Sequence, residues 1–286
     1  MTISPKRAQS VFRRLDRNLQ QLSAEQNAEA VHSFRTTTRR LQTLLEELVP
    51  ERTRKQKKLL KTLRGIRKQA GKIRDLDVQL AALNSLQVPL EPRRKTQLLQ
   101  GLLNVREIHE KKLRKTLTKQ VIRDIRGRIK RAAKDVKAET VRDPLAAARE
   151  ILAGAASTDR PMTEDGLHRC RLLVKRARYA TEFAPDSPAV AQFINQLKRL
   201  QDILGNWHDW LTLTQTAAER LGDVNQSPLV AVLHNVTGGK FRHAAAAIAA
   251  SPALRTGPQP ISAPSATIRK AGTQKAAQLF RKDSAA

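Results

Sequence analysis

The sequence contains few aromatic residues, which make up 3% of its 286 residues and include one tyrosine and two tryptophans. Proteins that bind single-stranded nucleic acids commonly stack bases on aromatic side chains. So few rings argue against that mode of binding. Contact with the phosphates of a duplex needs no aromatic ring, so duplex binding stays open as an alternative.

Cysteine and long apolar runs are also scarce. Cys170 is the only cysteine, so the chain has no intramolecular disulfide and no cysteine zinc motif, and we expect this residue to fill space in a helix. No apolar run approaches the roughly 18 residues of a membrane span. The segment from Met1 to Asp16 is polar and charged, so we expect no signal peptide and a soluble, cytoplasmic protein.

Acidic residues are in short supply. The chain has 26 Asp and Glu against 54 Lys and Arg, a formal net charge of +28. Such a surplus destabilises a compact state by self-repulsion unless anions offset it. The charge therefore predicts a polyanionic partner, and nucleic acid, polyphosphate and an anionic membrane all satisfy this criterion.

The composition up to about residue 250 favours an all-α fold. Leu, Ala, Lys, Arg, Gln and Glu dominate, and all are strong helix formers. No stretch alternates between apolar and polar residues for long enough to predict a strand. We expect helices over about 26–49, 51–86, 92–138 with a break near Gly127, 144–153, 163–184, 188–204, 206–222 and 228–249. Residues 251–286 are rich in Pro and Ala, and we expect this basic tail to be flexible and largely disordered.

Two amphipathic helices share one pattern of basic residues, His-x-x-Arg-x-x-x followed by two basic residues. It starts at His32 and again at His168, 136 residues later. A second block, Gly71–Asp75, corresponds to Gly205–Asp209 at a shift of 134. Two blocks in the same order at nearly the same shift suggest a duplication. We therefore predict two helical halves, at about 1–140 and 141–250.

The spacing of the first block places its charged residues in a row. Positions i, i+3 and i+7 lie on one face of a helix, so each histidine shares a stripe with two cations. Arginine offers paired donors to phosphoryl oxygens, and lysine offers a compact charge. A simpler interpretation also stays open, in which each stripe is a solvated helix face. In that case Arg74-Asp75 and His208-Asp209 serve only to hold neighbouring side chains in place.

These blocks resemble the CHAD family, the conserved histidine α-helical domain. The resemblance rests on Val31–Arg35 with Arg39–Leu41, Arg74–Val78, Leu167–Arg171 with Lys175–Tyr179, and Leu197–Gly205 with His208-Asp209. It implies two pseudo-symmetric four-helix bundles with a basic central channel that binds inorganic polyphosphate, and association with polyphosphate or related granules. Two features depart from the family pattern: Thr36-Thr37-Thr38 replaces a more apolar stretch, and the tail lies outside the domain.

The resemblance also implies a set of polyphosphate-binding residues. The residues carried over from the two stripes are His32, Arg35, Arg39, Arg40, His168, Arg171, Lys175 and Arg178. The long basic helix and its counterpart add Lys58, Lys61, Arg64 and Lys198 as weaker candidates.

The sequence offers little support for catalysis. It has no glycine-rich phosphate loop and no Glu-x-Glu-x-Lys signature, and its carboxylates are scattered. A metal site built from His32 and His168 is conceivable, but the flanking arginines suit an anion better. We expect no enzyme activity, no metal and no cofactor. A non-specific nucleic-acid-associated protein, and an enzyme that acts on phosphorylated substrates through His32, stay open as alternatives, and the sequence leaves the oligomeric state undetermined.

Overall fold

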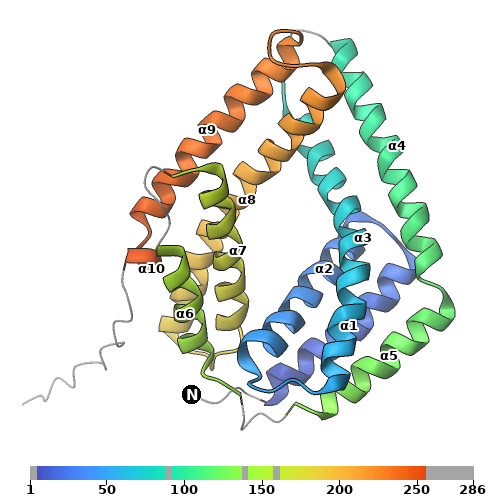
Figure 1. Cartoon of the computed structure of the whole chain (residues 1–286), viewed down its shortest axis with the longest axis vertical. Helices are drawn as coiled ribbons and strands as arrows, with labels where there is room; N and C mark the ends of the chain where they lie inside the picture. Colours follow the sequence, from blue (N-terminus) through green and yellow to red (C-terminus); the bar gives the residue numbers. More distant parts are fainter. Residues whose placement is uncertain (1–4, 88–91, 137–140, 157–161, 256–286) are drawn as a thin grey trace, which may run out of the picture.

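The computed structural model describes residues 5–87, 92–136, 141–156 and 162–255, and within these ranges it contains helices and no strands (Figure 1). The all-α prediction is therefore confirmed for this part of the chain. The predicted flexible tail, residues 251–286, lies outside it from residue 256 onward, and for Pro252–Arg255 the prediction is wrong because these residues form a short helix. The helices are α1 (Pro5–Ala24), α2 (Ala28–Thr43), η1 (Leu44–Leu48, a π-helical turn), α3 (Arg54–Ser85), α4 (Pro92–Thr116), α5 (Lys119–Lys134), α6 (Pro144–Ala156), α7 (Glu164–Thr181), α8 (Pro188–Leu221), α9 (Pro228–Ala250) and α10 (Pro252–Arg255).

Short polar side chains fix where most of these helices begin. Thr53 accepts a hydrogen bond from the backbone N–H of Gln56, whose side chain accepts one from the backbone N–H of Thr53. This capping box satisfies two N–H groups that a helix start leaves without partners. Single caps of the same kind precede α2, α5, α7, α8 and α9, at Asn27, Thr118, Thr163, Ser187 and Ser227.

Two predicted helix breaks are wrong. α8 runs without interruption through Gly205, and α5 runs through Gly127. A glycine inside a helix costs only about 1 kcal/mol relative to alanine, which tertiary packing readily offsets. The helix predicted over 92–138 is broken instead between Thr116 and Lys119, where the Thr118 side chain caps the start of α5.

The helices pack in the same order in the two parts of the chain. α1 packs on α2, α2 on α3 and α3 on α4, while α6 packs on α7, α7 on α8 and α8 on α9. In Figure 1 these two groups lie side by side, and α3 meets α8 while α2 meets α7. One apolar core extends through both groups, from Phe12 and Leu63 to Trp207 and Ile248. The predicted two-fold relation and the domain limits at 140 and 250 stay predictions.

Reciprocal ion pairs join the two groups where α2 and α7 end. Arg40 of α2 donates to Glu182 with 2.6 Å between Nε and Oε2. Arg176 of α7 donates to Glu47 with 2.6 Å between Nη2 and Oε1. Arg40 and Arg176 hold corresponding places in the two repeats, so each copy supplies the cation of one pair and the carboxylate of the other.

Candidate functional site

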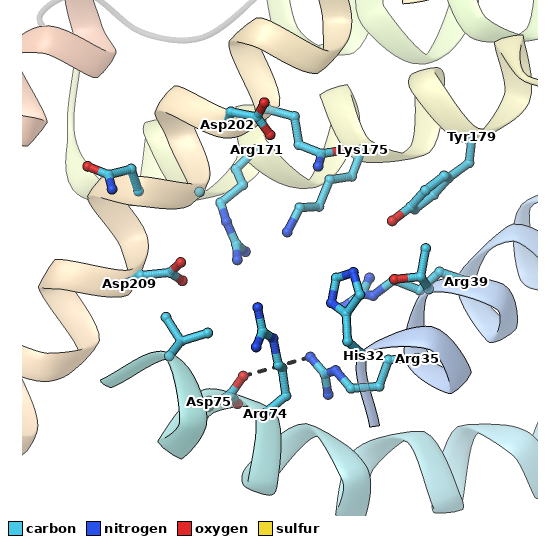
Figure 2. Close-up of a pocket in the computed structure, with 15 residues that line it drawn as sticks. His32, Arg35, Arg39, Arg74, Asp75, Arg171, Lys175, Tyr179, Asp202 and Asp209 are labelled. Carbon is cyan, nitrogen blue, oxygen red and sulfur yellow. Dashed lines mark ion pairs between the residues drawn. The ribbon is translucent and has the colours of Figure 1, made fainter. Parts of the chain in front are cut away.

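A pocket of about 360 Å³ lies between the two groups of helices. Figure 2 shows side chains from α2, α3, α7 and α8 pointing into it. Its lining includes five arginine or lysine side chains and three aspartates, so its formal charge is positive. The basic residues are Arg35, Arg39, Arg74, Arg171 and Lys175, the carboxylates are Asp75, Asp202 and Asp209, and His32, Thr36, Val78, Tyr179, Gln201, Gly205 and Asn206 complete the lining.

The apolar side of α2 determines which of its residues face the pocket. Phe34 and Leu41 are completely buried in the core. Arg35 and Arg39 lie one turn apart on another side of the helix and line the pocket together with His32. The apolar residues and the basic stripe of this amphipathic helix therefore lie on different sides of it in the fold. Partial burial and the charge of Arg74 lower the pKa of His32, which favours the neutral imidazole.

Arg35 lies directly against α3. Its Nη1 donates to the backbone carbonyl of Arg67 at 3.3 Å, and its Nη2 lies 3.7 Å from Oδ1 of Asp75. The guanidinium passes over Gly71, where the Cβ of any other residue would collide with Nη1. Gly71 therefore allows the close approach that fixes the position of Arg35.

Arg171 and Lys175 are the matching pair on α7. Burial lowers the pKa of Arg171, and Arg39 acts in the same direction while Asp209 opposes both. Burial, Arg171 and Arg39 together lower the pKa of Lys175 to about 7. Cations from α2 and α7 thus lie close enough to repel one another across the pocket, although they come from segments about 136 residues apart in the sequence.

Arg67 lies outside the pocket lining, but its backbone carbonyl accepts a hydrogen bond from Arg35, so it is a further cation close to the site that was not among the predicted residues. Burial and the charges of Arg39 and Arg35 lower its pKa to about 10. Its Nε is buried and has no hydrogen-bond partner within the described residues, and the same is true of Nε of Arg171. A buried guanidinium N–H without a partner is costly, and an anion would supply an acceptor.

The carboxylates offset only part of this repulsion. Asp75 acts on Arg35 and Arg171, and Asp209 acts on Arg171 and Lys175, in each case opposing the lowering of the pKa. Asp75 and Asp209 occupy equivalent places in the duplicated blocks, at the ends of the Gly71–Asp75 and Gly205–Asp209 segments. A supporting role for both residues is one interpretation that the sequence leaves open, and the contact between Asp75 and Arg35 agrees with it.

The structure brings five of the twelve predicted residues to this pocket: His32, Arg35, Arg39, Arg171 and Lys175. His168 lies instead beside His208, with ring centroids 5.3 Å apart. Arg40 and Arg178 both contact Glu182, at 2.6 and 3.5 Å, and both guanidinium groups lie over the ring of Tyr179. Arg64 pairs with Glu46 at 3.3 Å. The remaining three, Lys58, Lys61 and Lys198, are exposed on α3 and α8 outside the pocket lining.

Two features of the chain bear on metals and membranes. The described residues contain no group of three or more His, Cys, Asp and Glu side chains placed to hold a metal ion. None of the helices in the described ranges combines the length and the apolar composition that a membrane crossing requires.

Comparison with known proteins identifies the family of this chain and a solved structure with a similar fold. The family model described as the CHAD domain matches residues 6–218. The crystal structure of the CHAD domain from the plant Ricinus communis superimposes with a TM-score of 0.59 at 19% sequence identity, covering 87% of this chain and 86% of that one. At this identity the likeness concerns the fold alone. A search of curated proteins finds no significant match.

Proposed function

Because this chain belongs to the CHAD domain family, we propose that it binds inorganic polyphosphate in the pocket between α2 and α7. The observation that carries the proposal is the convergence of Arg35 and Arg39 with Arg171 and Lys175 on one cavity. Like charges held together in a partly buried site destabilise the fold, and a bound polyanion would relieve that repulsion.

The chemistry of the lining favours phosphate as the anion. Four of the five fully basic residues are arginines, whose planar guanidinium groups pair with phosphoryl oxygens through two hydrogen bonds. The N–H groups of Arg67 and Arg171 without partners offer further donors at or beside the pocket. A chain of linked phosphates presents acceptors at short, regular intervals and could contact cations of both halves at once.

The pocket suits a bare phosphate chain better than a nucleic acid. Tyr179 is the only aromatic side chain of its lining apart from the imidazole of His32. It is 5% exposed, and the guanidinium groups of Arg40 and Arg178 lie over its ring. It therefore offers no open face on which a base could stack. A duplex is far too wide for a cavity of about 360 Å³.

The biological role that we propose is binding rather than catalysis. Polyphosphate held by this domain would attach the protein to polyphosphate or related granules in the cytoplasm. Turnover of polyphosphate or of nucleoside triphosphates in the presence of a divalent metal would refute this part of the proposal and favour an enzyme.

The first experiment is a titration of the full chain with polyphosphate, with duplex DNA and heparin as competing polyanions. Polyphosphate should displace the protein from DNA at comparable phosphate concentration, and excess DNA should not reverse this. The affinity should fall steeply as salt is added, because phosphate contacts release counterions. Equal competition by all three polymers would favour a generic cationic surface and would contradict a dedicated polyphosphate site.

A matched pair of variants locates the site. The pocket variant replaces Arg35, Arg39, Arg171 and Lys175 with Ala, and it should lose at least about a hundredfold in affinity because charge-assisted hydrogen bonds contribute roughly 1.5–3 kcal/mol each. The control removes the same charge from the exposed face of α5, through Ala at Lys119, Arg123, Lys130 and Arg131. Removal of residues 256–286 is a second control. If either control loses as much affinity as the pocket variant, the assignment of the site is wrong.

A further inference from the structure

Lys175 is the only lysine among the fifteen residues that line the pocket. Figure 2 shows its amino group pointing into the cavity, on the same side as Arg171 and opposite the helix that carries Arg39. Within the described residues, no carboxylate lies within ion-pair distance of this amine. The amine therefore faces a site rich in guanidinium groups without a partner of its own.

This setting makes the amine chemically unusual. Its neighbours and its burial disfavour the ammonium form, and the pKa of Lys175 falls to about 7. At pH 7.5 about three quarters of such an amine is unprotonated, against roughly 0.1% of an ordinary lysine with a pKa near 10.4. A lysine beside other cations in a partly buried pocket is an established way to obtain a nucleophilic amine at neutral pH.

The arginines around this amine select the kind of electrophile that reaches it. Guanidinium groups bind phosphate through paired hydrogen bonds, and Arg39 and Arg171 both act on Lys175. A small molecule with a phosphate joined to a reactive carbonyl would have its phosphate drawn to these arginines, close to the amine. We propose that Lys175 is a site of covalent acylation by acyl phosphates. This inference rests on the proposed function in one respect, because it uses the affinity of the same pocket for phosphate.

The reaction needs no cofactor and no further reactant. The neutral Nζ of Lys175 attacks the carbonyl carbon of the acyl phosphate, and a C–N bond forms while the carbonyl oxygen takes up negative charge. The bond between the carbonyl carbon and the phosphate oxygen then breaks, and the phosphate leaves with the electron pair. The nitrogen gives one proton to the departing phosphate. One amine and one acyl phosphate dianion therefore yield one amide and one hydrogen phosphate dianion.

The modification would act on the proposed function directly. An amide cannot be protonated at neutral pH, so acylation removes one of the five fully basic residues of the pocket. The added acyl group also takes up space in a cavity of about 360 Å³. Acylated protein should therefore bind polyphosphate more weakly, and the small metabolites that carry activated acyl groups would regulate polyphosphate binding.

The test measures acylation of the full chain by acetyl phosphate, residue by residue, with mass spectrometry. Lys175 should react at least about tenfold faster than the exposed Lys61 and Lys198, because an amine with lowered basicity is free to attack at neutral pH. A neutral acetyl ester of N-hydroxysuccinimide is the comparison reagent. The preference for Lys175 should shrink with this ester, because it carries no phosphate for the arginines to bind. An equal preference with both reagents would overturn the proposed selection of acyl phosphates.

Two further measurements separate this inference from the proposed function. Polyphosphate in excess should protect Lys175 from acetyl phosphate. If Lys175 reacts selectively but polyphosphate gives no protection, the acylation site stands and polyphosphate binding in this pocket is refuted. If the pocket variants abolish polyphosphate binding but Lys175 reacts no faster than Lys61, the acylation site is refuted alone. Lys175→Gln, which imitates the loss of charge, should weaken polyphosphate binding. Lys175→Arg keeps the charge and should retain most of the affinity. Equal losses of affinity in the two variants would refute regulation by loss of charge.

Discussion

The contact between Arg35 and Gly71 leads to a sharp prediction. A methyl group at position 71 would collide with Nη1 of Arg35, and the guanidinium would have to leave its place over α3. Gly71→Ala should therefore displace a pocket arginine without removing it. The backbone of α3 has no reason to move, because the colliding atoms belong to the far end of a flexible side chain.

The expected stability change is small because two effects oppose each other. Alanine is better than glycine inside a helix by about 1 kcal/mol. The hydrogen bond from Arg35 to the carbonyl of Arg67, 3.3 Å long, is lost. A hydrogen bond from a charged donor contributes about 1.5–3 kcal/mol, and its length and partial exposure place this one at or below the lower limit. The free energy of unfolding should thus change by no more than about 1 kcal/mol.

Polyphosphate affinity should respond much more strongly. Misplacing one arginine that contacts phosphate should cost about 1.4 kcal/mol, or about tenfold in the dissociation constant. The assay is a titration with polyphosphate beside a denaturant unfolding curve for the same variant. Gly65→Ala on the same helix is the control, because nothing lies within 4 Å of a Cβ at that position. It should stabilise the fold slightly and leave affinity unchanged. Unchanged affinity in Gly71→Ala would show that the position of Arg35 over α3 does not matter for binding.

Three other predictions concern protonation, the junction between the halves and the core. Since Lys175 has a pKa of about 7 in the free protein and a bound polyanion would restore its charge, binding at pH 8 should take up about 0.9 proton, and affinity should fall as pH rises above 7. Calorimetry in two buffers of different ionisation enthalpy measures this uptake, and its persistence in Lys175→Arg would assign it to another group. Glu182→Gln should lower the free energy of unfolding by about 1 kcal/mol, because it weakens the partly exposed ion pair with Arg40. The same variant should leave polyphosphate affinity unchanged, and a large loss of affinity would mean that this junction is part of the binding site. Leu63→Ala, at a completely buried position, should cost about 2–5 kcal/mol in chemical denaturation, and a smaller cost would mean that the core relaxes into the space.

The fold class and much of the core can be read from the sequence. The segment Glu51–Asp75 has eleven basic residues, yet apolar residues recur in it at helical spacing. Five of them are buried in α3: Leu59, Leu60, Leu63, Ile66 and Ile73. The predicted break at Gly205 fails because local propensity is a weak signal beside packing. Leu204 and Trp207, on either side of this glycine, are completely buried and hold α8 in one continuous helix.

The pocket is predictable only in part, because spacing defines a stripe on a helix but not the partner that the stripe meets. His32 and His168 begin equivalent stripes, yet only His32 lines the pocket, while His168 packs beside His208. On α3, the predicted residue Lys61 lies too far from the pocket along the helix axis. Lys61 and Arg74 are separated by about 20 Å of helix at 1.5 Å per residue, and only the later residue reaches the cavity. The Arg74-Asp75 block, repeated in place at His208-Asp209, was the available signal for that part of α3.

The distribution of the scarce carboxylates explains why the pocket keeps its positive charge. Where α2 and α7 end, Glu47 and Glu182 neutralise Arg176 and Arg40, and these pairs join the two halves. Arg39 and Lys175, which directly precede Arg40 and Arg176 in the sequence, have no carboxylate within ion-pair distance among the described residues, and the charge of Arg39 helps to lower the pKa of Lys175. The same duplicated basic run therefore serves two purposes. Its last residue stabilises the junction, whereas the residue directly before it has no carboxylate partner among the described residues. The polyanion that we propose would relieve the repulsion that this leaves in the pocket.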